Sequence, residues 1–210
     1  MSEATQARMG NSMSAKPDSN TTNPTIFLRL RNSDPQPREF AWDEFSSRYG
    51  PIISSFVLQL GGKAQDVDDV VQDVLLGFFL RSPTFVYDSA KGRFRSYLRV
   101  CTYRVLHQRL GKAARVNGTP LDQIDPQSVA IEQIWDDIWA EDLLRRAMEE
   151  TRQEIGNTKT FAAFELFVIH DESAADIAVK LEMHVNSVYR AKDEVMRQLR
   201  TRLATMRDED

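Results

Sequence analysis

Apolar residues recur at steps of three and four along most of the chain, and no segment shows the alternation typical of a strand. This pattern predicts an all-α protein. The predicted helices cover approximately residues 40–60, 66–82, 93–110, 134–155, 161–168, 173–181 and 185–204. Within the first of them, Gly50-Pro51 is expected to break or kink the helix, because proline lacks the N–H that the helix ladder needs.

Two segments interrupt the helical pattern and set the domain organisation. Residues 1–24 are rich in Ser, Thr, Asn, Ala and Pro, have no apolar core of a signal peptide, and are predicted to be a disordered tail. Residues 112–133 contain Gly118, Pro120 and Pro126 without a sustained period, which indicates a flexible linker. The expected architecture is therefore two small helical domains, 25–111 and 134–207, joined by that linker.

The charge of the chain is unevenly distributed. The net charge is −4, but residues 91–115 hold eight Lys or Arg and no acid, and residues 121–154 hold ten acids against three Arg. Residues 173–207 are basic again, with seven basic residues against four acids. Two basic blocks that flank an acidic one favour a polyanionic partner for each basic block.

A helix-turn-helix pattern lies in the second basic block. Ser173-Ala-Ala-Asp176 is a capping box that opens a short helix, and residues 182–184 form the turn before the last helix. Glu182 occupies the turn position where glycine is usual and is expected to be left-handed, at a cost of about 1 kcal/mol. A helical hairpin of a structural bundle is the alternative interpretation.

The first basic block continues the third predicted helix. Arg95, Arg99, Arg104 and Arg109 lie off its apolar stripe, and aromatic residues are interleaved with them, as in grooves that bind unstacked bases. Tyr103 is compatible with either the core or a base contact. Phe85 and Tyr87 in the preceding loop are compatible with core plugs or base contacts.

Several function classes find little support. The three histidines show no metal-ligand spacing, and there is no glycine-rich phosphate loop or nucleophile elbow, so neither an enzyme nor a cofactor is expected. No apolar run is long enough for membrane insertion. The single cysteine, Cys101, cannot form an internal disulfide and lies on the apolar stripe, which predicts a buried thiol in a cytoplasmic protein.

With these features in order, the chain resembles the extracytoplasmic-function (ECF) sigma factors of the sigma-70 superfamily. The resemblance rests on Asp69-Val-Val-Gln72, then Phe94-Arg-Ser-Tyr97-Leu98 at the start of a basic helix, and then the helix-turn-helix. It departs from the family at Tyr97, where many relatives carry Trp, at Arg104 and Gln108, where Asn and Asp are frequent, and at Glu182.

The resemblance implies transcription initiation through binding of promoter DNA and core RNA polymerase, including its β′ and β subunits. It allows an anti-sigma factor as a further partner, and it directs the linker toward the RNA exit path. The residues implied in polymerase binding are Asp66, Asp69, Gln72 and Asp73. Those implied in minus-ten DNA binding are Tyr87, Lys91, Arg93, Arg95, Arg99, Tyr103, Arg104, Gln108 and Arg109.

The last helix is expected to read the minus-thirty-five element in the major groove. The residues concerned are Val185, Asn186, Ser187, Tyr189, Arg190, Lys192 and Arg197. Arg190 is compatible with a guanine contact or a phosphate contact. A one-component repressor that acts without polymerase and a protein-binding adaptor are the alternative functions.

Overall fold

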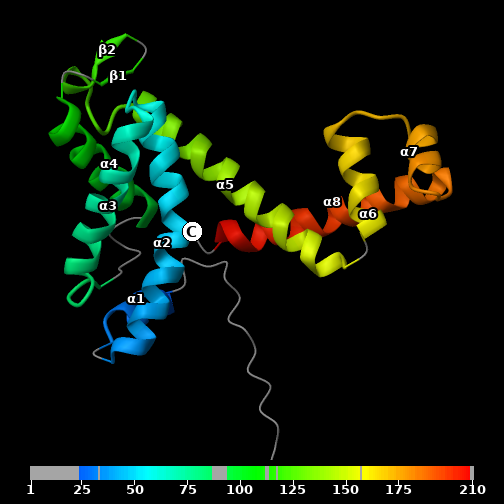
Figure 1. Ribbon diagram of the computed structural model, residues 1–210, viewed down its shortest axis with the longest axis horizontal. Helices are drawn as coiled ribbons and strands as arrows, with labels where there is room; N and C mark the ends of the chain where they lie inside the picture. Colours follow the sequence, from blue (N-terminus) through cyan, green and yellow to red (C-terminus); the bar gives the residue numbers. More distant parts are fainter. Residues whose placement is uncertain are drawn as a thin grey trace, which may run out of the picture.

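The computed structural model describes residues 24–32, 34–86, 94–111, 114–116, 118–156 and 158–208 (Figure 1). Residues 1–23 of the predicted disordered tail lie outside these residues, whereas its last residue, Pro24, begins a helix. The all-α prediction is confirmed, with two very short strands that the sequence pattern did not predict. The helices are α1 (Pro24–Leu30), α2 (Pro35–Gln59), α3 (Ala64–Arg81), α4 (Phe94–Leu110), α5 (Val129–Ile155), α6 (Thr158–Phe164), α7 (Ala174–Lys180) and α8 (Val185–Asp208).

The first bundle is built from α1 to α4 around an aromatic core. Phe45 of α2 stacks on Phe78 of α3 with ring centroids 4.5 Å apart, and Phe94 of α4 packs edge-on to both rings. Phe27 of α1 closes the cluster at 4.9 Å from Phe94. Aromatic side chains bury large areas, so the rings contributed by the four helices form a large part of the contact between them.

Of the break or kink expected at Gly50-Pro51, the break is wrong, because α2 continues through Pro51 to Gln59. Pro51 is exposed, so the carbonyl that loses its partner lies on the side of the helix that water reaches. The following residues Ile52 and Ile53 are fully buried. Their packing outweighs the missing hydrogen bond.

The segment expected to be a flexible linker is packed onto the first bundle. Strands β1 (Arg115–Val116) and β2 (Thr119–Pro120) form an antiparallel hairpin, followed by the 3-10 turn η3 (Leu121–Gln123). Ala114, Val116 and Leu121 are buried in the first core. Gly61, with φ +83°, lets β1 approach closely, because a Cβ at this position would lie 2.4 Å from the carbonyl oxygen of Arg115.

Helix α5 belongs to both bundles. It begins at Val129, inside the expected linker, and runs 27 residues from the first bundle to the second (Figure 1). Its first half buries Ile131, Trp135 and Trp139 in the first core, and its second half buries Leu143 and Ala147 in the second. The two cores therefore meet within α5, not at residues 133–134.

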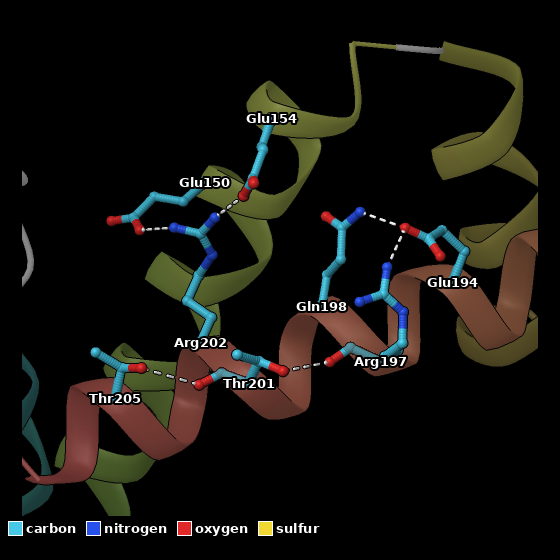
Figure 2. Close-up of polar contacts among 8 residues, drawn as sticks. All are labelled: Glu150, Glu154, Glu194, Arg197, Gln198, Thr201, Arg202 and Thr205. Atoms are coloured by element: carbon cyan, nitrogen blue, oxygen red, sulfur yellow. Dashed lines mark hydrogen bonds and ion pairs between the residues drawn. The ribbon is translucent and has the colours of Figure 1, made fainter.

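In the second bundle, α6 and α8 pack against the second half of α5, and α7 and a π-helical turn η4 (Glu165–Ile169) pack against α8. Its apolar contacts are supplemented by polar ones between α5 and α8, which Figure 2 shows. Arg202 of α8 contacts Glu150 at 2.6 Å and also Glu154 on the next turn of α5. This guanidinium joins the long helix to the C-terminal helix.

Candidate nucleic-acid interface

The helix-turn-helix forms as the sequence predicts. The Ser173 hydroxyl accepts a hydrogen bond from the Asp176 amide at 3.2 Å, which caps α7. Glu182 in the turn has φ +51°, the left-handed conformation that was expected. The Met183 amide then donates to the Ala178 carbonyl at 2.9 Å, a bond that closes the end of α7.

The start of α8 presents polar side chains to solvent while its core residue faces inward. Val188 is fully buried against α7, whereas Asn186 and Arg190 are exposed and lie one turn apart on the outer face. Val185 is also exposed, and Ser187 is half-buried. This geometry suits a helix whose first turns enter a groove.

Three further residues predicted in this helix contact neighbouring side chains. Tyr189 packs edge-on against Phe167 of η4 at 5.6 Å, and the Lys192 ammonium lies 5.7 Å from the centre of the same ring. Arg197 bonds Glu194 at 2.7 Å (Figure 2), and this bond lowers the pKa of the Glu194 carboxyl. Phe167, which the sequence analysis did not single out, therefore helps to position two predicted contacts.

The basic helix α4 offers fewer free cations than its sequence indicates. Arg104 and Gln108 are exposed. Arg95 lies 3.5 Å from Asp136 and Arg99 lies 2.9 Å from Glu132, both on α5. Tyr87, Lys91 and Arg93 lie outside the described residues.

Tyr103 is part of the core. Its ring is 3% exposed, and its hydroxyl lies 2.8 Å from the Leu121 carbonyl oxygen and 2.5 Å from that of Ile124. Burial raises the pKa of this phenol. Of the two roles that the sequence left open for Tyr103, the geometry favours the structural one. Cys101, expected to be buried, is half-buried.

The predicted polymerase-binding residues of α3 lie on different faces of that helix. Asp69 and Asp73 face α4 and both bond Arg109, at 3.0 and 2.6 Å. The hydrogen bond with Asp73 raises the pKa of the arginine. Asp66 accepts from the Lys63 amide at 3.2 Å and thereby caps the helix.

The fourth of these residues, Gln72, faces α2 at an apolar groove of about 530 Å³. Asp68, which the sequence analysis did not assign to this surface, lies one turn before it and also lines the groove. The floor and walls are apolar or aromatic and come from both helices: Trp42, Val71, Leu75, Leu76 and Phe79. An apolar groove with a polar rim is the usual form of a helix-docking surface.

A comparison with family models finds a match for one part of the chain. Residues 45–116 match the model of sigma-70 region 2. The chain therefore contains a sigma-70 region 2. The resemblance to the sigma-70 superfamily that the sequence predicts is confirmed by this match. Region 2 so defined includes α3, α4 and strand β1, while Trp135 and Trp139 contribute to its core from outside the matched segment.

The other two comparisons identify no domain beyond region 2. No curated protein sequence matches the chain. One solved structure that matches is described as CnrH in complex with the cytosolic domain of CnrY. The two chains are 16% identical, and their alignment covers 92% of this chain and 99% of the CnrH chain. The superposition has a TM-score of 0.35.

Two features of the acidic block outside region 2 escaped the sequence analysis. Glu132 and Asp136 are spaced four apart, so the sequence contained the signal that both face one side of a helix. Which basic residues they meet depends on how α5 packs, and the periodicity does not contain this information.

Across the described ranges, no helix is both long and apolar enough to span a membrane.

Proposed function

We propose that this protein is a sigma factor of the ECF class, which directs core RNA polymerase to promoters and acts by binding and not by catalysis. The observation that carries this proposal is a sigma-70 region 2 joined, in one chain, to a helix-turn-helix with an exposed polar first turn. In this proposal, region 2 makes the contacts with core polymerase and with the minus-ten element. The helix-turn-helix supplies a second DNA-binding element at a distance from it.

For polymerase, we propose that the docking surface is the α2–α3 groove together with the acidic residues beside it. Gln72 and Asp68 lie at the groove, and Asp69 and Asp73 lie on the neighbouring face of α3. Asp66 contributes less directly, because its carboxylate caps the helix. The apolar floor would bury a partner helix, and the carboxylates would select basic residues along it.

For the minus-ten element, we propose a surface made of the exposed part of α4 and the preceding loop. Arg104, Gln108 and Arg95 are its described members. Arg109 joins them when it exchanges its carboxylate partners for phosphate. We do not include Tyr103 and Arg99, because both are buried in internal contacts.

For the minus-thirty-five element, we propose that Asn186, Ser187 and Arg190 approach base edges and that Lys192 and Arg197 approach phosphates. Val185 and Tyr189 would add apolar contacts to the groove wall. The exposure of Asn186 and Arg190 on one face supports this arrangement. An anti-sigma factor stays a prediction from the resemblance, and a cytoplasmic location stays a prediction from the single cysteine.

The first test is transcription in vitro with sigma-free core polymerase and a promoter library. The wild-type chain should support initiation and select a two-part motif. A chain that binds duplex DNA specifically but does not support initiation would be a one-component regulator instead. A chain that does neither would be a protein-binding adaptor.

The second test separates base reading from phosphate binding at α8. Arg190→Ala should change the preferred base at one or two upstream positions, at a cost of roughly 1–3 kcal/mol. The control is Arg200→Ala, which removes the same charge from an exposed position further along α8. If Arg190→Ala recovers the same motif more weakly, Arg190 binds a phosphate, and base reading passes to Asn186 and Ser187.

A further inference from the structure

Three of the four arginines of α4 that the sequence places on promoter DNA are paired with carboxylates of the same chain. Arg109 is shared by Asp69 and Asp73 of α3. Arg95 and Arg99 face Asp136 and Glu132 of α5. The α5 pairs are distinctive because their acids come from outside the region 2 segment, on a helix that leads to the second bundle.

Packing fixes the two α5 carboxylates in place. Glu132 follows Ile131, and Asp136 follows Trp135; both apolar side chains are at most 1% exposed in the first core. The Trp135 ring packs edge-on to Phe56 at 4.8 Å. Residues four apart share a helix face, so burial of one face presents both acids to α4 together.

Stability alone does not account for these pairs. Arg99 is 7% exposed, and its Nε has no hydrogen-bond partner among the described residues. Burial of an incompletely bonded guanidinium has a desolvation cost that often exceeds the gain from pairing. The Arg95–Asp136 pair is loose and partly exposed, and pairs of this kind contribute little to folding. Their larger effect is on the electrostatic potential of the α4 surface.

We propose that Glu132 and Asp136 act as an electrostatic brake that lowers the affinity of the α4 surface for DNA phosphates. The brake restrains DNA binding by the free protein, so that productive binding requires the additional contacts of the polymerase complex. This proposal rests on the proposed function, in which α4 lies along promoter DNA. Asp136 competes with phosphates for the Arg95 guanidinium, and Glu132, paired with the buried Arg99, lowers the positive potential beside it. Both effects are strongest at low salt.

The sharpest test compares two adjacent residues. Asp136→Asn removes the partner of Arg95, whereas Asp137→Asn removes an equal charge from a carboxylate that accepts from Gln133 at 2.7 Å. The isolated full-length protein is titrated with a fluorescent forked DNA of arbitrary sequence over a range of salt. Asp136→Asn should bind about threefold to tenfold tighter at low salt, with a salt slope steeper by up to about one. Asp137→Asn should change affinity less.

A double-mutant cycle assigns the effect to the pair. In an Arg95→Gln background, Asp136→Asn should lose most of its gain. Equal effects of Asp136→Asn and Asp137→Asn would overturn the proposal, as would a gain that persists without Arg95 or no measurable gain in any variant. Glu132→Gln tests the second acid, with a thermal melt to establish that it folds.

The proposed brake and the proposed function can be disproved independently of each other. Wild-type transcription with core polymerase tests the function without reference to Asp136. If transcription is absent but the Arg95-dependent gain is observed, the function is wrong and the brake stands. If transcription is present and the gain is absent, the brake alone is wrong.

Discussion

At the residue scale, exposure and pairing divide one basic helix into side chains with different roles. Arg104 is exposed, and no ion pair is formed by it within the described part of the chain. Arg99, five residues earlier, is buried against a carboxylate, and Tyr103 holds the segment that follows α4. Sequence places all three in the same basic block, so only the structure separates surface from core.

Substitution of Arg104 tests directly whether the exposed surface of α4 binds DNA phosphates. Arg104→Ala should weaken binding to DNA of any sequence and lower the salt slope by about one, because one phosphate contact is lost. Folding stability should change by less than about 0.5 kcal/mol, since the side chain is exposed. Arg31→Ala, an exposed arginine just after α1, is the control and should leave the salt slope unchanged. A change in sequence preference without a change in slope would contradict the phosphate role.

Substitution of Tyr103 tests whether this residue stabilises the core. Tyr103→Phe keeps the ring but leaves the Leu121 and Ile124 carbonyls without their donor, so unfolding in urea should show a loss of about 1–3 kcal/mol. Because burial raises the pKa of this phenol, the wild-type advantage should be complete below pH 10.0 and decline as the pH rises above that value. Unchanged stability combined with lost promoter opening would indicate a base contact instead.

At the element scale, local signals predicted the helix-turn-helix and failed for the segment after α4. The Ser173 cap, the left-handed Glu182 and the buried Val188 all follow from neighbouring residues, and all are found, although Asp176 accepts from the Ser173 hydroxyl and not from its amide as a full capping box requires. The hairpin β1–β2 had a signal too, the Asn-Gly dipeptide at positions 117–118, which favours two-residue hairpin turns. That this hairpin and η3 dock onto the bundle depends on tertiary contacts with Gly61 and Tyr103, which no local pattern contains.

The turn of the helix-turn-helix offers a test of backbone strain. Glu182 is exposed and has φ +51°, which costs an L-residue about 1 kcal/mol or more and costs glycine almost nothing. Glu182→Gly should therefore raise the free energy of unfolding slightly, by at most about 1 kcal/mol, because glycine also gains entropy in the unfolded chain. Calorimetric melting measures this change. Glu182→Ala is the control, since it removes the same side chain and keeps the strain; equal melting of the two variants would contradict strain relief.

At the scale of the whole molecule, α5 is a shared structural element and not a connector between independent domains. Its apolar stripe is continuous, so the sequence pattern gives no mark where one core ends and the next begins. In the structure the change falls near Asp142, which is buried and bonds Arg145 and Arg146 at 2.6 and 2.8 Å. Any movement of one bundle relative to the other must therefore bend α5 or detach one of its halves.

Truncation tests where the first bundle ends. Besides Ala114, a fragment of residues 1–111 lacks six larger buried side chains of its core: Val116, Leu121, Ile131, Trp135, Ile138 and Trp139. At about 1.5–3 kcal/mol each, their loss is comparable to the entire stability of a small domain, about 5–15 kcal/mol. The 1–111 fragment should therefore not melt cooperatively, whereas a 1–141 fragment should.

The Trp135→Ala variant of the longer fragment is the control for the part that α5 plays. It should lose about 3–5 kcal/mol, because this ring is 1% exposed and packs on Phe56. Circular dichroism melts of the three proteins measure these differences. Cooperative melting of 1–111 at the temperature of 1–141 would place the boundary at residue 111, and α5 would then be a connector. Because Glu132 and Asp136 reach α4 only through this packing, the same result would also remove the structural basis of the electrostatic brake.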